Sequence, residues 1–328
     1  MPSLSKNNDK TLNGSHVLIT GATGFIGSHL ARKLLDANCK VSVFIRPSSD
    51  LWRIQDIIDQ LDVHHGDLNR FDPNELQSKL SGVRILYHLG AHGVNPSVRD
   101  IPTMMETNIQ GTLRLLRLAR DLKIDRFVYC GSCSEYGSGN SLSESDALKP
   151  IDEYGISKSS AWILVNMFYH KHGLPVVSLR PFTPYGPFEL AYRLVPHTIL
   201  SVLNKEDIKL TGGKQTRDFI FIEDVVGAFL MAGIKEEIIG DTFNVCSGKA
   251  VSIKEVVLTI TQLMNSPVKP LFGAQPYRES ELWTSSGNPS HAERKLSWTA
   301  KTSLEHGLTK TIAWFKKNLK RYTAYSCG

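Results

Sequence analysis

The sequence lacks an apolar run long enough to cross a membrane, and residues 1–13 are polar, without the apolar core of a signal peptide. The remaining composition is ordinary for a globular protein, since 41% of the 328 residues are hydrophobic and 21% are charged. This length suits one large domain or one domain with a smaller lobe. We therefore expect a cytoplasmic protein with loosely placed residues 1–13 and no membrane partner.

Cysteine is scarce, and its pattern argues against a disulfide framework. The five cysteines are odd in number and scattered in spacing, which favours a reducing cytosol. Cys130 and Cys133 form a C-x-x-C pattern, but no second pair or histidine cluster follows at zinc spacing. We therefore interpret these two thiols as packing residues and expect no metal.

The sequence also lacks a basic block interleaved with aromatic residues, so it does not predict nucleic-acid binding, although the net charge is +6. The densest basic run, residues 316–321, ends a predicted amphipathic helix and is expected to face water. A modest positive excess instead suits polyanionic ligands such as dinucleotides and nucleotide sugars.

What the sequence does contain is a glycine-rich turn between the predicted strand 17–19 and a helical pattern at 28–35. In such a turn the first glycine permits the bend, the second lets the backbone approach a pyrophosphate, and the third lets the helix pack on the strand. The helix N-terminus adds unpaired N–H groups. A turn without a ligand is the alternative that this stretch alone leaves open. The cofactor contacts expected here are Gly21, Thr23, Gly24, Phe25, Ile26 and Gly27.

The end of the predicted strand 40–45 bears on the choice of cofactor. An acidic residue at this strand end binds the ribose 2′-hydroxyl of NAD, whereas an arginine accommodates the 2′-phosphate of NADP. The sequence places Arg46 there and Ser49 shortly after it, with Asp50 next. These residues favour NADP(H), with NAD(H) as the alternative. A further alternative is that Arg46 is only a solvated arginine at a strand end and does not contact a cofactor.

Two further strand ends are expected to contact the cofactor. After the predicted strand 61–65, the carboxylate of Asp67 could accept a hydrogen bond from an adenine amino group or could only cap its turn. Small residues after the predicted strand 83–89 leave room for a ligand across the sheet. The contacts expected at these two ends are Asp67, Leu68, Leu89, Gly90 and Ala91.

A tyrosine and a lysine four residues apart open the predicted helix that begins near residue 154. This spacing places Tyr154 and Lys158 on one helix face, where a lysine ammonium can lower the pKa of a tyrosine hydroxyl. Ser132, after the predicted strand 126–130, could donate a hydrogen bond to the same substrate oxygen. We predict these three as the catalytic residues of hydride transfer between C–OH and C=O beside a nicotinamide. Tyr154 and Lys158 are also expected to contact the cofactor, the lysine through a hydrogen bond to the nicotinamide ribose. Asn108, within the predicted helix 101–122, either links the sheet to this site or lies at the surface.

With these motifs the chain resembles the extended short-chain dehydrogenase/reductase family, in its nucleotide-sugar epimerase/dehydratase branch. The resemblance runs from about residue 15 to residue 317. It rests on residues 21–27, 66–68, 88–91, 108–112, 154–158, 215–220, 243–248, 296–298 and 309–312.

The resemblance implies an α/β fold with a Rossmann-like, doubly wound parallel sheet in residues 14–180. A smaller mixed α/β lobe in residues 181–328 would close over a nucleoside diphosphate sugar, with segments around 219–245 folding back onto the first lobe. It also implies a homodimer through the helices that carry Asn108 and Tyr154. By the same resemblance the expected substrate contacts are Ser134, Thr183, Arg217 and Arg278, of which the two arginines would grip the diphosphate or would form only structural salt bridges.

Departures from the family's patterns narrow the reaction. Dehydratases of the branch carry an acid directly after the catalytic hydroxyl residue, where this chain has Cys133 and Ser134, so dehydration is disfavoured. Glu135 resembles the pattern of reductases that act on nucleotide-linked 4-keto-6-deoxyhexoses, and Arg46 agrees with such a reductase. A 4-ketoreductase is therefore the leading hypothesis, a 4-epimerase is the alternative, and a non-catalytic cofactor-binding protein is the hypothesis of another class.

Overall fold

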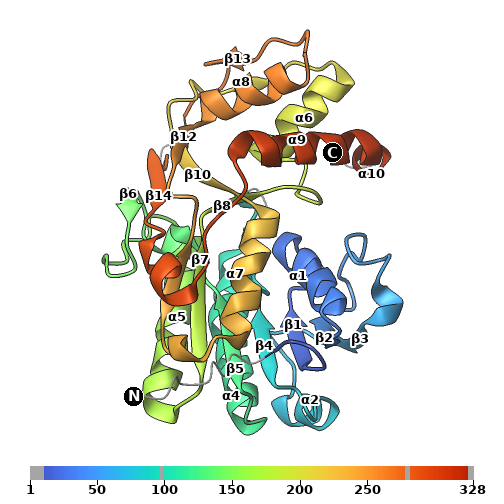
Figure 1. Ribbon diagram of the computed structural model, residues 1–328, viewed down its shortest axis with the longest axis vertical. Coiled ribbons are helices and arrows are strands. Elements are labelled where there is room, and N and C mark those ends of the chain that lie inside the picture. The colour runs from blue at the N-terminus through green and yellow to red at the C-terminus, as the bar shows by residue number, and fades with distance from the viewer. Residues whose placement is uncertain (1–10, 97–98, 278–280, 324–328) are drawn as a thin grey trace, which may run out of the picture.

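The computed structural model describes residues 11–96, 99–277 and 281–323; most of the segment 1–13, expected to be loosely placed, lies outside these ranges. A seven-stranded sheet, parallel throughout, forms the centre of the first lobe (Figure 1). Its order, in which the chain starts at the middle and reverses direction, is that of a Rossmann fold. From edge to edge the strands are β11 (Thr242–Val245), β7 (Val176–Pro181), β5 (Arg126–Cys130), β4 (Ile85–His88), β1 (His16–Thr20), β2 (Lys40–Ile45) and β3 (Asp62–His65).

Helices cover both faces of this sheet because alternate strand residues face opposite sides. Val17 and Ile19 of β1 belong to one apolar cluster, together with residues of α1 (Phe25–Asp36) and α7 (Ile222–Ile234). Leu18, between them, belongs to a second cluster with α2 (Pro73–Lys79), α4 (Thr112–Asp121) and α5 (Glu153–His172). The expected doubly wound fold is therefore confirmed.

The helix expected over residues 101–122 is interrupted by a wider turn. It comprises α3 (Ile101–Met105), a π-helical turn at Glu106–Gly111, and α4. Such π turns place an extra residue in the helix and are frequent at functional sites. The turn contains Asn108, whose side chain is buried.

The second lobe lies above the carboxyl ends of the sheet strands in Figure 1. Its strands are β12 (Ala250–Ser252), β10 (Thr216–Phe221), β14 (Thr284–Gly287), β6 (Gly139–Leu142) and β8 (Thr183–Tyr185), with a separate pair of β9 (Lys209–Leu210) and β13 (Leu271–Phe272). Its helices are α6 (Leu194–Asn204), α8 (Ile253–Leu263), α9 (Leu304–Asn318) and α10 (Lys320–Thr323).

Pairing between distant segments shapes the chain locally at two places. Residues 137–150 are mostly polar, yet they contain β6, which pairs in parallel with β14 from nearly 150 residues away. The helix α7 begins at Ile222 and not earlier, because Phe219 pairs with Thr183 as part of a strand. At both places the pairing overrides the local sequence pattern.

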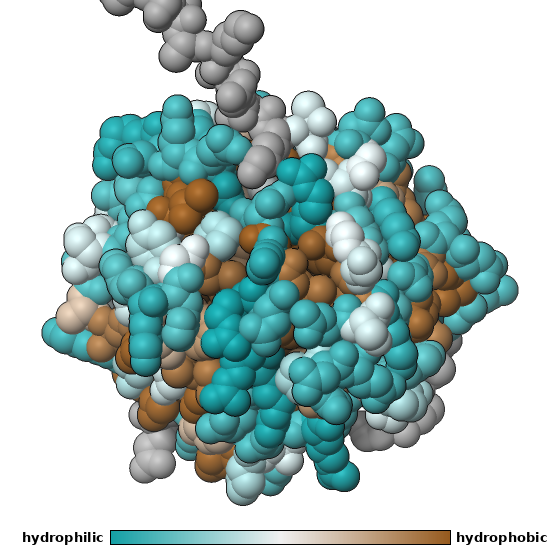
Figure 2. All heavy atoms as spheres, turned by 90° about the horizontal axis from the view of Figure 1, so that it is seen from below, coloured by the Kyte–Doolittle hydropathy of each residue, from teal (hydrophilic) through white to brown (hydrophobic). Residues whose placement is uncertain are grey.

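At one end of the molecule, the described part of the surface carries no segregated hydrophobic face (Figure 2). Figure 2 shows the end of the molecule that lies lowest in Figure 1, where hydrophilic and hydrophobic residues are interspersed. Among the helices in the described ranges, none has the length and apolar character needed to cross a membrane.

Candidate active site

A cavity of about 1040 Å³ opens where the carboxyl ends of the sheet strands meet the second lobe. This is the place where open α/β sheets bind their ligands. Every expected site residue within the described ranges lies in its wall; Arg278 falls outside those ranges. The expected residues in the wall are Gly21, Thr23, Gly24, Phe25, Ile26, Gly27, Arg46, Ser49, Asp67, Leu68, Leu89, Gly90, Ala91, Ser132, Ser134, Tyr154, Lys158, Thr183 and Arg217.

The glycine turn is shaped for a close backbone approach. Gly21 has a φ of +76°, and a Cβ atom there would lie 2.6 Å from the nitrogen of Gly90 on the neighbouring strand end. A Cβ atom on Gly27 would collide with the carbonyl oxygen of Gly21. Gly24 caps α1 without a side-chain hydrogen bond, so the first N–H groups of the helix face the cavity without a side-chain acceptor. This geometry fits the pyrophosphate of a dinucleotide.

At the end of β2, Arg46 and Ser49 lie in the cavity wall, and Ser49 N–H donates to the carbonyl of Arg46 at 3.0 Å. Asp50 is turned elsewhere: its carboxylate accepts from the amide of Trp52 at 3.1 Å. Asp67 uses one carboxylate oxygen to cap its own turn, accepting from the Asn69 amide at 3.0 Å, while it also lies in the wall. The strand end therefore presents a cation and a hydroxyl to the ribose region.

Local structure fixes the three candidate catalytic residues. Ser132 follows β5 and caps the short 3₁₀ turn Cys133–Glu135, where its Oγ accepts from the Ser134 amide at 3.1 Å. That bond occupies a lone pair of the hydroxyl and leaves its proton available to the cavity. Tyr154 lies in the first turn of α5, which Asp152 caps by accepting from the Gly155 amide at 2.8 Å.

Lys158 lies one turn further along α5 and is buried, with its Nζ 4.4 Å from the centre of the Tyr129 ring. Burial lowers the pKa of the Lys158 ammonium. Burial also raises the pKa of Tyr154, and the Cys130 thiol adds to this effect. Sequence reasoning expected Lys158 to bring the pKa of Tyr154 down. Among the described protein groups, desolvation instead dominates, so the phenol is kept protonated at neutral pH.

Asn108 links the π-helical turn that contains it to His92 in the cavity wall and to α5. Its side-chain amide donates to the His92 carbonyl at 3.0 Å and to Ser157 Oγ at 2.9 Å, and its carbonyl accepts from the His92 amide at 2.8 Å. Ser157 in turn donates to the carbonyl of Tyr154 at 2.8 Å. The alternative of an ordinary surface asparagine is therefore wrong.

The cavity wall around Arg217 also carries a carboxylate, Glu281, which was not expected there from the sequence. Arg217 donates to Glu281 at 3.1 Å and to its neighbour's carbonyl at Thr216, so the salt-bridge alternative for this arginine is realised in the structure. Thr183 and Ser134 lie in the same wall. Among the described residues, no group of three His, Cys, Asp or Glu side chains is placed to hold a metal ion.

Sequence reasoning missed several charged wall residues, among them Arg99, Glu189 and Arg193. Arg99 pairs with Asp152 at 2.9 Å and lies over the Tyr154 ring at 5.8 Å. Glu189, buried in the wall, accepts from Arg193 at 3.3 Å through one carboxylate oxygen, while the other is buried without a partner among the described residues. These residues lie in the connections that follow β4 and β8, outside helices and strands, where no periodic pattern marks them.

Glu135, whose position resembles that of reductases, does not reach the cavity wall formed by the described residues. It is fully buried and pairs with Arg180 of β7 at 2.7 Å. Its effect on a substrate therefore passes through its neighbours.

Comparisons with known proteins identify the family to which the chain is similar. The model of the NAD-dependent epimerase/dehydratase family matches residues 17–246. A UDP-glucuronate 4-epimerase of Thermodesulfobacterium geofontis is 27% identical over 321 residues, which cover 93% of this chain and 97% of the relative. The UDP-glucose 4-epimerase of Thermotoga maritima, solved with UDP-glucose, is 27% identical, with a TM-score of 0.84. The match covers 93% of this chain and 99% of the epimerase chain. MoeE5, solved with UDP-glucuronic acid and NAD, is 29% identical, with a TM-score of 0.83. The match covers 93% of this chain and 100% of the MoeE5 chain.

Proposed function

Because the chain belongs to the NAD-dependent epimerase/dehydratase family, we propose that it reduces the C4 ketone of a nucleoside-diphosphate-linked 4-keto-6-deoxyhexose, with NADPH as the reductant. The observation that carries this proposal is that Ser132, Tyr154 and Lys158 line the same cavity as the glycine turn, whose shape fits a dinucleotide. The reaction adds a hydride to the carbonyl carbon and a proton to its oxygen, giving an alcohol.

The glycine turn would hold the pyrophosphate of the dinucleotide, and Arg46 with Ser49 would hold a ribose 2′-phosphate. When bound, NADPH supplies the hydride. Among the described residues that follow β2, Arg46 and Ser49 lie in the cavity wall whereas Asp50 accepts from the Trp52 amide outside it, and this supports NADPH over NADH. MoeE5 and other relatives were solved with NAD, so NAD(H) is the competing cofactor.

Tyr154 is the proton donor of the proposed reaction. Its raised pKa keeps the hydroxyl protonated before the reaction, as a ketone reduction requires. The Ser132 hydroxyl, whose lone pair is engaged by the Ser134 amide, donates a hydrogen bond to the same substrate oxygen. The ammonium of Lys158, one turn from Tyr154, stabilises the phenolate that remains after proton transfer.

The cavity wall beside Ser132 supports reduction over dehydration. Cys133 and Ser134, the two residues that follow Ser132 in the wall, offer no carboxylic acid for removing water from C5 and C6 of the sugar. Burial also raises the pKa of the Cys133 thiol to about 11, which makes it a poor base at neutral pH.

A 4-epimerase is the second candidate, favoured by the similarity to the UDP-glucose 4-epimerase of Thermotoga maritima. An epimerase would use the same three residues, with Tyr154 first removing a proton from the C4 hydroxyl. The two reactions differ in their cofactor balance, because only the reductase consumes NADPH.

Replacing the proton donor tests the enzymatic assignment. Tyr154→Phe should bind NADPH as the wild type does and lose about 10²-fold or more in kcat. Wild-type activity in a folded, cofactor-binding Tyr154→Phe variant would rule out this role.

We also infer a cytoplasmic homodimer in which α5 packs against a partner copy. Ile156, Ile163 and Met167 are exposed on α5, and their spacing places them on one helix face. A monomer in solution at micromolar concentration would contradict this inference.

A further inference from the structure

A buried ion pair lies behind Ser132, on the side away from the cavity. Glu135 and Arg180 are both fully buried, and Glu135 Oε2 lies 2.7 Å from Arg180 Nε. The other oxygen of Glu135 accepts from the backbone amide of Ser132 at 2.8 Å. Ser132 is thus held at two points, since its Oγ accepts from Ser134 while its own N–H donates to Glu135.

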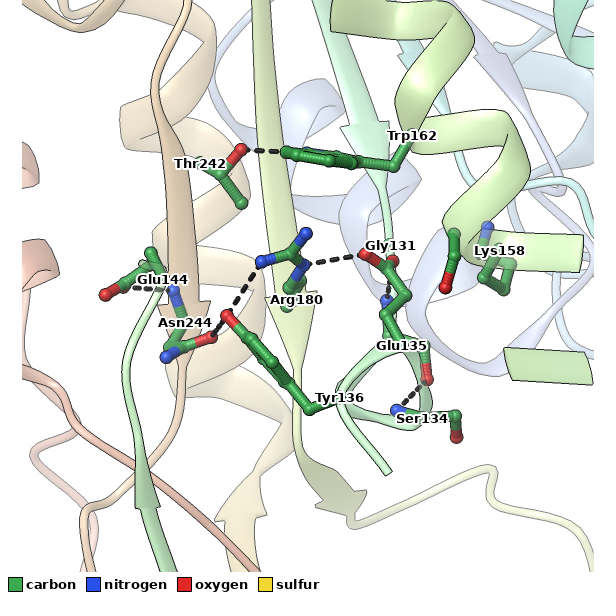
Figure 3. Close-up of polar contacts among 12 residues, drawn as sticks. Gly131, Ser134, Glu135, Tyr136, Glu144, Lys158, Trp162, Arg180, Thr242 and Asn244 are labelled. Atoms are coloured by element: carbon green, nitrogen blue, oxygen red, sulfur yellow. Dashed lines mark hydrogen bonds and ion pairs between the residues drawn. The ribbon is translucent and has the colours of Figure 1, made fainter. Parts of the chain in front are cut away.

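Arg180 extends this contact to the helix that carries Tyr154 and Lys158. Figure 3 shows its guanidinium between Glu135, the Tyr136 ring and Trp162 of α5. The guanidinium lies 4.6 Å from the Tyr136 ring centre and 4.8 Å from that of Trp162. It also donates to the Tyr136 hydroxyl at 2.8 Å.

The network continues into the outermost strand of the sheet. The Tyr136 hydroxyl donates to Asn244 of β11 at 2.8 Å, and Trp162 donates to Thr242 of the same strand at 2.9 Å. Asn244 donates in turn to the carbonyl of Leu142 at 2.8 Å, at the end of β6. The guanidinium of Arg180 in β7 therefore joins the turn at residues 132–135, which we call the serine turn, to α5, β11 and β6.

The space behind the serine turn fits only this arrangement. A Cβ atom on Gly131 would collide with Glu135 Oε1, so the carboxylate fills the room that a side chain at position 131 would need. A buried ion pair adds little net stability compared with apolar residues of similar volume, because both charges lose their hydration. The ion pair therefore matters chiefly for where it holds the residues that it contacts.

We propose that Glu135 and Arg180 are positioning residues, which hold Ser132 in register with Tyr154 and so set the rate of carbonyl reduction without contacting substrate or cofactor. This rests on the proposed function of the site. It also gives a physical meaning to Glu135, which the sequence alone associates with reductases: its carboxylate fixes the serine turn from behind.

The double variant Glu135→Leu/Arg180→Met tests this directly, because it removes both charges together and leaves neither one buried alone. The matched control is Arg126→Met, which removes another fully buried guanidinium at the opposite end of β5. We expect the double variant to lose about 10²-fold in kcat, with KM for the nucleotide sugar and Kd for NADPH within about threefold of wild type. Arg126→Met should keep the wild-type kcat.

Hydrogen exchange of the backbone in residues 131–137 gives a readout that needs no turnover. Loss of the Glu135 acceptor should speed exchange of this segment in the double variant and not in Arg126→Met. If the double variant does not fold, the more conservative Glu135→Gln is measured in its place. It keeps the side-chain volume, but its single amide oxygen can accept from only one of Arg180 Nε and the Ser132 amide, so one of the two contacts is lost.

Unchanged kcat and unchanged exchange in a folded variant would overturn the positioning role. Equal losses in kcat, substrate affinity and cofactor affinity would also overturn it, since they indicate general disruption. If the wild type turns over no nucleotide sugar, the proposed function fails, and the exchange measurement still decides whether the pair holds the serine turn.

Discussion

Arg217 donates a 3.1 Å hydrogen bond to Glu281 in the wall of the cavity. A guanidinium in this position could grip a diphosphate at two points, but one of its donors is already used by a carboxylate. Burial lowers the pKa of Arg217, and the nearby Glu281 carboxylate opposes that shift and so favours the charged form of the arginine. A nucleoside diphosphate that binds at Arg217, as we propose, would therefore compete with Glu281 for this guanidinium.

Glu281→Gln should tighten nucleoside diphosphate binding by about threefold to tenfold, because it removes the competing charge and its repulsion of phosphate. Isothermal titration with UDP, TDP and CDP measures this, with the exposed Glu293→Gln as the control. Weaker binding would show that Glu281 holds Arg217 in its productive position.

Arg46→Ala should weaken NADPH binding by about tenfold or more and leave NADH binding nearly unchanged, because only NADPH carries the 2′-phosphate. Fluorescence titration with both cofactors gives the ratio. Asp50→Asn is the matched control, since its carboxylate is engaged with the Trp52 amide, and the ratio should stay as in wild type. Equal losses for both cofactors in Arg46→Ala would show that this strand end does not select the cofactor.

Glu189 should make the protein less stable as the pH rises. Burial raises the pKa of this carboxyl from 4.5 to about 7. The unfolded chain therefore ionises first, so the free energy of unfolding falls between these two pH values. Urea unfolding at pH 5 and pH 8 should show a fall roughly 2 kcal/mol larger in wild type than in Glu189→Gln, since one pKa unit corresponds to about 1.4 kcal/mol.

The exposed Glu305→Gln variant is the control for this comparison and should keep the wild-type pH dependence. If wild type and Glu189→Gln lose stability in parallel between pH 5 and pH 8, Glu189 is ionised in the folded protein at both values.

Asn108→Ala should lower the free energy of unfolding by about 2–3 kcal/mol, because it leaves both His92 backbone groups and the Ser157 hydroxyl without this partner. The activity of the folded variant should fall as well, since Ser157 bonds to the carbonyl of Tyr154. Asn74→Ala, at an exposed position of α2, should change neither. Wild-type stability of Asn108→Ala in urea unfolding would contradict the role of this side chain as a link.

Sequence patterns predicted the parts of the site that local rules govern. The glycine turn, the strand ends and the Tyr154–Lys158 spacing depend on residues close together in the chain, and the structure brings them to one cavity. The patterns could not find β6, because its polar residues become a strand only through pairing with β14. Arg99 and Glu189 were missed for a similar reason, since they reach the cavity from loops whose course depends on both lobes.

The orientation of neighbouring side chains was also beyond sequence reasoning. Ser134 and Glu135 are adjacent, yet one lies in the cavity wall and the other is buried against Arg180, because the short 3₁₀ turn directs them apart. The direction of the pKa shift of Tyr154 also could not be predicted from the four-residue spacing, because desolvation raises this pKa and the spacing carries no information on desolvation.

The most direct test is to incubate the protein with NADPH and a panel of nucleotide-linked 4-keto-6-deoxyhexoses and hexoses, following cofactor absorbance and sugar NMR together. Our account predicts that one NADPH is consumed for each new 6-deoxyhexose formed, and that Tyr154→Phe abolishes both signals. A change in sugar configuration without net loss of NADPH would contradict the reductase and establish the epimerase. No reaction with any sugar, while NADPH remains bound, would contradict an enzymatic role on these substrates.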